Sequence, residues 1–182
     1  MQPQMDAREI AREKLIVALD VSSAQEANRL FTILQGHVGM FKVGSQLFTS
    51  VGPQIVRDIV STGERVFLDL KFHDIPNTVA AAGVEATRLG VSIFNVHAGG
   101  GKEMMRATGE AVAHEVATRG VTRPAIIAVT VLTSIDEITL SETGTECTPE
   151  EQVRRLALLA RKAGLDGVVA SPEEIGLICS LP

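Results

Sequence analysis

Two kinds of segment alternate along the chain, and they differ in the spacing of their apolar residues. Short runs rich in Val and Ile predict buried strands, and longer stretches with apolar residues at helical spacing predict helices. The predicted strands are 14–21, 40–44, 65–72, 91–98, 124–132 and 166–171. The predicted helices are 22–35, 52–63, 76–90, 100–120 and 148–164. Strands that alternate with helices indicate an α/β fold built on a parallel sheet.

Residues at the ends of the predicted helices support these boundaries. Ser22 and Thr148 are suitable N-caps, and Thr148 is followed by Pro149 at the first helical position. Pro76 is expected to begin another helix in the same way. Several helices are predicted to stop at a glycine just before the next strand. These glycines are Gly63, Gly90, Gly120 and Gly164.

Two architectures fit this pattern, a doubly wound open sheet and a (β/α)₈ barrel of the TIM type. The first strand ends in LDVSS and is not followed by a GxGxxG motif. Polar residues lie near the carboxyl ends of several strands, where barrels place their active sites. We therefore predict a single barrel domain over residues 1–182. About six of its eight βα units are visible, so the barrel is expected to be incomplete at the C-terminus; an open six-stranded sheet is the alternative.

Composition narrows the possible partners. The net charge is −5, Trp and Tyr are absent, and no cluster of Lys and Arg occurs, which argues against a nucleic-acid surface. No apolar run reaches the roughly 18 residues of a membrane span. The N-terminal segment lacks the apolar core of a secretory signal, and Cys147 and Cys179 form no disulfide framework. We expect a cytoplasmic protein that acts on a small molecule.

The stretch VFLDLKFHDIPNT, residues 66–78, places charges inside an apolar strand. Asp69 and Lys71 are two residues apart, so they are predicted to share one face of the strand. Lys42 and Asp20 lie near the ends of the two preceding strands, and Asp74 follows just after this one. A buried structural ion pair is one interpretation. A set of two lysines and three aspartates on one rim is better explained by chemistry on a substrate.

Three chemical uses of this set can be distinguished. A Mg²⁺ site on Asp69 and Asp74 is disfavoured because a lysine between them would repel the cation. Schiff-base chemistry is disfavoured because neighbouring carboxylates keep a lysine charged. A charged lysine is instead suited to deliver a proton to a carbanion. His73 is expected to pack or hydrogen-bond, and His97 is a candidate for the wall of the site.

The motif LDLKFHDIPNT resembles the signature of the orotidine 5′-phosphate decarboxylase family. The segments IVALDV, FKVG, NVHA and AVTVLTS occur in the same order as in that family, and the resemblance runs from about residue 14 to 171. It implies a homodimeric (β/α)₈ barrel that converts orotidine 5′-phosphate to UMP in pyrimidine biosynthesis, without a cofactor or metal. The family's phosphate-binding residues belong to its last two strands, which are expected beyond Pro182.

The resemblance also implies roles for individual residues. Asp69 would face the substrate carboxylate, and Lys71 would protonate the carbon that loses CO₂. Asp20 and Lys42 would bind substrate, with Lys42 near the ribose, as part of the charge network. The remaining residues would bind across the dimer or at the pyrimidine: Asp74, Ile75 and Thr78 would enter the partner's active site, and Thr133 would lie near the pyrimidine.

Two alternatives stay open at this stage. One is a Mg²⁺-dependent sugar-phosphate decarboxylase or lyase of the same superfamily, which shares the D-x-K-x-x-D core of the motif. The other is a non-catalytic role for a chain that lacks the last two strands.

Overall fold

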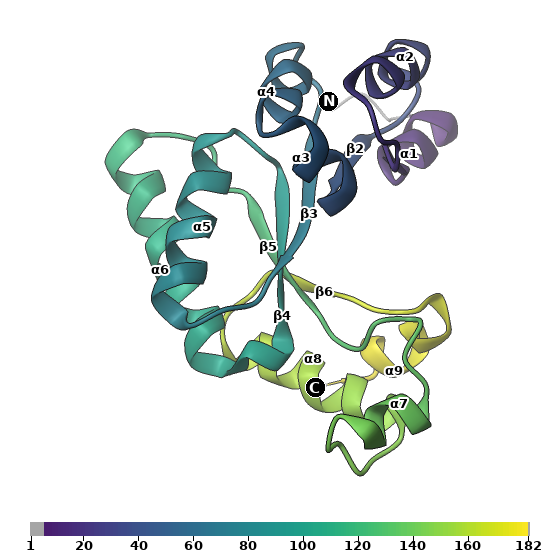
Figure 1. Ribbon diagram of the computed structural model, residues 1–182, viewed down its shortest axis with the longest axis vertical. Helices are drawn as coiled ribbons and strands as arrows, with labels where there is room; N and C mark the ends of the chain where they lie inside the picture. The colour runs from purple at the N-terminus through teal and green to yellow at the C-terminus, as the bar shows by residue number, and fades with distance from the viewer. Residues whose placement is uncertain (1–5, 182) are drawn as a thin grey trace.

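The computed structural model describes residues 6–181, which form a parallel sheet surrounded by helices (Figure 1). The strands are β1 (Ile16–Ala18), β2 (Met40–Gly44), β3 (Val66–Phe72), β4 (Ile93–His97), β5 (Ala125–Val129) and β6 (Gly167–Val169). The longer helices are α2 (Ala24–Leu34), α4 (Gln54–Ser61), α5 (Pro76–Arg88), α6 (Gly101–Arg119) and α8 (Pro149–Lys162). The shorter ones are α1 (Ala7–Glu13), α3 (Ser45–Val51), α7 (Glu137–Glu142) and α9 (Ile175–Cys179), with 3₁₀ turns at Ala98–Gly100 and Pro172–Glu174.

The order of the strands decides between the two architectures. The sheet order is β1-β2-β3-β4-β5-β6, and every neighbouring pair is parallel. A doubly wound sheet reverses its strand order at a switch point, whereas a barrel adds each new strand to the same side. The sheet therefore follows barrel topology, and its strands curl with the helices outside them (Figure 1). Within residues 6–181 the sheet has six parallel strands, and β1 and β6 are its two edges.

All six predicted strands and all five predicted helices are confirmed, with small shifts at their ends. Thr148 accepts a hydrogen bond from the backbone of Glu151 in a complete capping box. The prediction of Ser22 as an N-cap is wrong by one residue, because Ser23 accepts the hydrogen bond from the backbone of Glu26. The hydroxyl of Ser50 instead donates to the carbonyl of Ser22.

The core lies between the sheet and its helices. Val43, Leu68, Phe94 and Ile126 come from four successive strands and are almost fully buried. Gly83 lets α5 approach α6 and β4, since an added Cβ would lie 3.0 Å from a Thr108 methyl and 3.1 Å from the Phe94 ring. This apolar layer fixes the strands, and the strands in turn position charged side chains near their carboxyl ends.

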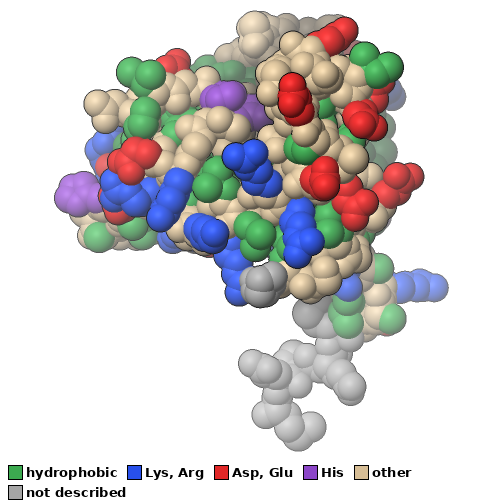
Figure 2. All heavy atoms as spheres, turned by 90° about the horizontal axis from the view of Figure 1, so that it is seen from below, with side chains coloured by type: hydrophobic (Ala, Val, Ile, Leu, Met, Phe, Trp, Pro, Cys, Tyr) green, Lys and Arg blue, Asp and Glu red, His purple; other side chains and the backbone are tan. Residues whose placement is uncertain are grey.

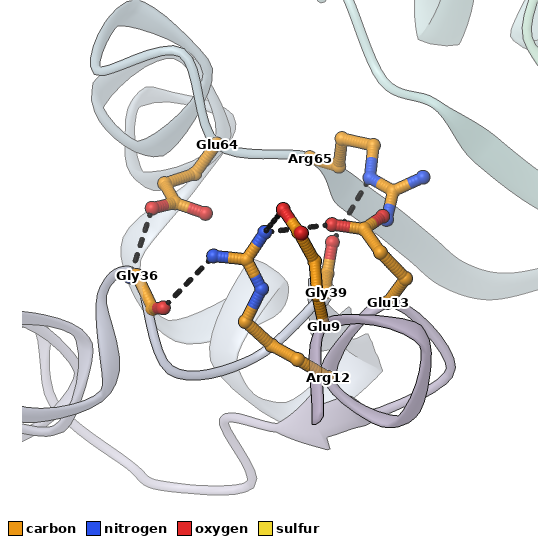
Figure 3. A network of polar contacts seen from close by, with 7 residues as sticks. All are labelled: Glu9, Arg12, Glu13, Gly36, Gly39, Glu64 and Arg65. Carbon is orange, nitrogen blue, oxygen red and sulfur yellow. Dashed lines mark hydrogen bonds and ion pairs between the residues drawn. The ribbon is translucent and has the colours of Figure 1, made fainter. Parts of the chain in front are cut away.

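Helix α1 is fastened to the base of β2 and β3, at the amino ends of the strands (Figure 3). The guanidinium of Arg65 pairs with the carboxylate of Glu13 and donates to the carbonyl of Gly39 at 2.9 Å. The backbone itself is close here, because a Cβ on Gly39 would lie 2.5 Å from the Glu13 carbonyl oxygen. Only glycine fits at this contact.

The face seen in Figure 2 carries Lys and Arg side chains towards its middle, with acidic side chains to either side and hydrophobic ones scattered between them. No helix within residues 6–181 combines the length and the apolar character that crossing a membrane requires.

Candidate active site

Four charged side chains of alternating sign lie in a line along the carboxyl ends of the first three strands. The Lys42 Nζ atom is 3.1 Å from Asp20 Oδ1 and 3.3 Å from Asp69 Oδ2. The Lys71 Nζ atom is 2.7 Å from Asp69 Oδ1. The structure thus brings together Asp20, Lys42, Asp69 and Lys71, which the sequence predicted to converge. We call these four residues the charge line.

The strand register explains why residues so far apart in sequence meet. Lys42 of β2 is level with Ala18 of β1, two residues before Asp20. Gly44 is level with Asp69 of β3. A Cβ on Gly44 would lie 3.3 Å from Asp20 Oδ1 and 3.4 Å from Lys42 Nζ. The glycine therefore leaves room for the first ion pair of the charge line.

Exposure decreases from one end of the charge line to its centre. The side chains of Asp20, Lys42 and Asp69 are 61%, 20% and 11% exposed. Burial of the Asp69 carboxyl acts to raise its pKa. Hydrogen bonds from Lys71 and Asn95, with the positive charges of Lys71 and Lys42, outweigh burial and hold the pKa of Asp69 below its ordinary value of 3.8. The central carboxylate is therefore ionised at neutral pH and fixed between two ammonium groups.

Asn95 of β4 belongs to the same cluster, and sequence reasoning missed it. Its side-chain Nδ2 donates to Asp69 Oδ1 at 2.6 Å, and its Oδ1 accepts the backbone N–H of Lys71 at 2.8 Å. Asn95 is 1% exposed. A signal was present, since a polar amide inside the apolar run VSIFNVHA must find hydrogen-bond partners when it is buried.

The backbone at Lys71 departs from the regular strand that the sequence predicted through residue 72. Lys71 has φ 52°, and it is the one residue other than glycine in the left-handed region within residues 6–181. The pairing of β3 with β4 shifts register between Leu68 and Phe72. Asp69 and Lys71 still contact each other, but an irregular backbone and not simple alternation produces that contact.

Asp74, Ile75 and Thr78 lie beyond β3, at the start of α5. Asp74 Oδ1 accepts the backbone N–H of Ile75 at 2.6 Å, and the Ile75 side chain is 65% exposed. Within the described residues, Asp74 forms no ion pair with the charge line. A small pocket is lined by Lys71 together with the exposed residues His73, Asp74 and Thr78. Asp74 and Thr78 therefore border the site beside one end of the charge line.

Thr133 is exposed in the loop that follows β5, and the structure does not bring it into contact with the charge line. The nearby Thr130 is buried, and its hydroxyl donates to the carbonyl of Val169 at 2.9 Å. That hydrogen bond ties the end of β5 to β6.

The two histidines near the site form a pair. The rings of His73 and His97 are 5.4 Å apart and tilted by 35°. Burial is the main cause that lowers the pKa of His97, and the neighbouring His73 and Lys71 lower it further, which outweighs the opposing effect of Asp69. His97 is therefore neutral at neutral pH, which suits a wall or hydrogen-bonding position near the Lys71 ammonium.

The donor set suits a cation poorly. Each oxygen of Asp69 already faces a lysine ammonium, Oδ1 that of Lys71 and Oδ2 that of Lys42. In the part of the chain that the structure describes, no three His, Cys, Asp or Glu side chains converge as metal ligands. The site is built to hold positive charge from its own lysines.

Comparisons with known proteins place the chain in a family. Residues 13–179 match the profile described as the orotidine 5′-phosphate decarboxylase / HUMPS family. Orotidine 5′-phosphate decarboxylase of Syntrophotalea carbinolica is 58% identical over 92% of this chain, which spans 69% of that relative. The Geobacter sulfurreducens protein of the same name is 58% identical over 94% of this chain and 71% of the relative.

Solved structures give the same result for the fold. The crystal structure of orotidine 5′-phosphate decarboxylase from Lactobacillus acidophilus superimposes with a TM-score of 0.83 and 35% identity, covering 90% of this chain and 74% of that one. The Pyrococcus horikoshii OT3 enzyme superimposes with a TM-score of 0.68 and 25% identity, covering 90% and 72%. With barrel topology and a family match that spans residues 13–179, the chain belongs to the orotidine 5′-phosphate decarboxylase / HUMPS family.

Proposed function

We propose that this protein decarboxylates orotidine 5′-phosphate to UMP, a step of pyrimidine biosynthesis, by means of the charge line. The observation that carries the proposal is the contact between Lys71 and Asp69, in which an ammonium is held 2.7 Å from a buried carboxylate at the sheet's carboxyl rim. Membership of the family and 58% identity to enzymes named for this reaction support it.

The reaction needs what these side chains supply. The bond between the pyrimidine ring and its carboxyl carbon breaks, CO₂ leaves, and the electron pair stays on the ring carbon. A fixed ammonium stabilises that developing negative charge and then donates a proton to it. We assign this role to Lys71. Asp69 would face the substrate carboxylate, favouring its departure, and would keep Lys71 oriented.

The other residues of the charge line would bind substrate. Lys42 is held between two carboxylates, so its position is fixed before substrate arrives. We assign Lys42 and Asp20 to the ribose side of the substrate. We assign Thr133 to the pyrimidine side, in agreement with its exposed position after β5.

We also propose a homodimer with shared active sites. Asp74, Ile75 and Thr78 are exposed at the rim and stand apart from the charge line. An exposed isoleucine beside a carboxylate is suited to contact a second copy, where Asp74 would complete the partner's charge network. A cytoplasmic location is part of the proposal and is supported by the free thiols of Cys147 and Cys179.

The test is formation of UMP from orotidine 5′-phosphate, followed by chromatography, with Lys71→Ala as the decisive variant. We expect Lys71→Ala to abolish turnover while its far-UV circular dichroism spectrum remains that of the wild type. Lys102→Ala is the matched control, because Lys102 is exposed on α6 outside the site. Near-normal turnover by Lys71→Ala would contradict the assignment of the proton donor.

The two alternatives give different results in the same assay. The matched family is broad, so one alternative is a Mg²⁺-dependent enzyme that acts on a sugar phosphate. Such an enzyme would lose activity when a chelator removes the metal. A non-catalytic chain would form no UMP and would bind no substrate. Turnover of orotidine 5′-phosphate that persists in the chelator contradicts both.

A further inference from the structure

We propose that Asn95 is a positioning residue of this site, whose side-chain amide holds the Asp69 carboxylate and the Lys71 backbone in the geometry that aims the Lys71 ammonium. For its effect on turnover, this inference rests on the proposed function. The geometric part stands on the contacts alone and can be tested without turnover.

The amide bridges two strands through two different groups. Its Nδ2 lies 2.6 Å from Asp69 Oδ1, and its Oδ1 lies 2.8 Å from the backbone nitrogen of Lys71. A carboxylate only accepts hydrogen bonds and a backbone N–H only donates, so these two partners fix which end of the amide is which. With 1% of its surface exposed, Asn95 is out of reach of solvent that could replace either partner.

The acceptor side of Asn95 supports the unusual backbone of Lys71. The backbone φ of 52° at Lys71 is intrinsically unfavourable, because residues with a Cβ rarely adopt it. The shift of register between β3 and β4 takes the Lys71 N–H out of the regular ladder. Asn95 Oδ1 accepts that N–H and thereby stabilises the irregular turn that sets the direction of the lysine side chain.

The donor side of Asn95 acts on the partner of Lys71. Asp69 Oδ1 accepts from both Lys71 Nζ and Asn95 Nδ2, so the carboxylate cannot rotate without losing one of them. The lysine is consequently held at both ends by one side chain, directly through its backbone and indirectly through Asp69. A residue that served stability alone would need neither link to the charged pair.

Two substitutions separate the two halves of the amide. Asn95→Ala removes both contacts, and we expect kcat to fall on the order of 10- to 100-fold with a smaller change in KM, because the ammonium is displaced from the reacting carbon. Asn95→Asp keeps the acceptor for the Lys71 N–H but places a second carboxylate against Asp69. Thr108→Val is the control, since it removes one hydrogen bond from an equally buried side chain in α6.

The pH profile is the readout that a purely structural role would leave unchanged. Two adjacent carboxylates cannot both ionise easily, so in Asn95→Asp the introduced carboxyl and Asp69 would together bind a proton at a pH above the ordinary aspartate range. Once protonated, the new side chain can donate to Asp69 as the amide did. We therefore expect the activity of Asn95→Asp, relative to the wild type, to rise as the pH falls, and that of Thr108→Val to keep a constant ratio.

Nuclear magnetic resonance tests the geometry without relying on turnover. The backbone N–H of Lys71 should exchange slowly with solvent, and the carboxyl of Asp69 should titrate at a higher pH in Asn95→Ala than in the wild type. Fast exchange at Lys71, an unchanged Asp69 titration, or wild-type kcat in both variants would each overturn the inference. If the wild type forms no UMP, the proposed function fails, whereas the exchange and titration data still decide whether Asn95 holds the pair.

Discussion

Replacing Asp69 with Asn tests whether the charge line depends on its central carboxylate. The substitution preserves shape but leaves two ammonium groups, from Lys42 and Lys71, around a neutral amide. Removing one partner of a fully buried ion pair costs about 3–5 kcal/mol. The Lys42 and Lys71 side chains are 20% and 35% exposed, so solvent screens part of this repulsion. We expect a loss of about 1–3 kcal/mol, or a fall in Tm of roughly 2–12 °C for a chain of this size.

The effect should depend on pH in a direction that the pKa of Asp69 fixes. That pKa is lowered in the folded protein, so the stabilisation is present at pH values above the unfolded value of 3.8. It is lost as the pH falls through the lower, folded pKa. The difference in Tm between the wild type and Asp69→Asn should therefore be full at neutral pH and shrink in acid.

Thermal unfolding followed by far-UV circular dichroism between neutral pH and the acid range measures this difference. Glu103→Gln is the matched control: it makes the same chemical change in an exposed pair with Arg106 on the surface of α6. Such surface pairs contribute about 0–1 kcal/mol, so its Tm should stay near that of the wild type. The reasoning is refuted if Asp69→Asn melts with the wild type at neutral pH, or if a Tm difference persists undiminished in acid.

Further predictions concern the base of the barrel, the dimer and the substrate reaction. Gly39→Ala should lower the Tm, because its Cβ would enter the backbone of Glu13, with an overpacking cost of about 1–3 kcal/mol; Gly109→Ala, in open space on α6, should stabilise by about 0.5–1 kcal/mol, and similar Tm values for both would contradict the steric argument. Mixing Lys71→Ala with Asp74→Ala subunits should restore about a quarter of wild-type turnover, since each mixed dimer regains one intact shared site. No recovery after exchange of subunits would count against shared sites. Turnover should be unchanged after treatment with a chelator, and its loss would favour the metal-dependent alternative.

Most of the fold could be predicted from the sequence because its signals are local and repeated. Each strand is a short apolar run, and helices such as α8 begin at a Thr-Pro cap and end before a glycine. The short helices α1, α3, α7 and α9 were not predicted, since five to seven residues give too little periodicity to distinguish a helix from a turn. Local pattern does not contain the order of the strands. The barrel was predicted instead from the polar residues at the strand ends and from the family resemblance, and the observed strand order confirms it.

The site was only partly predictable for a related physical reason. The charges of Asp20, Lys42, Asp69 and Lys71 are conspicuous in apolar strands, and rules for parallel sheets place them at one rim. Asn95 carries no charge, and its importance comes from which neighbours it reaches across the sheet. The left-handed backbone of Lys71 could not be predicted either, because glycine is the residue that usually indicates such a conformation in a sequence.

The charge line contributes little to stability compared with an apolar cluster of the same size, which favours a functional role for it. A well-packed apolar pair often stabilises a sheet as well as a buried ion pair, without the cost of desolvating charge. Here the chain also places a non-glycine residue at φ 52° and interrupts the pairing of β3 with β4. Strained backbones persist where the surrounding structure fixes them, often at functional sites. Asn95 and Asp69 hold the backbone and side chain of Lys71 in this conformation. The unfavourable backbone of Lys71 and the fixed position of its ammonium group therefore both result from the same contacts.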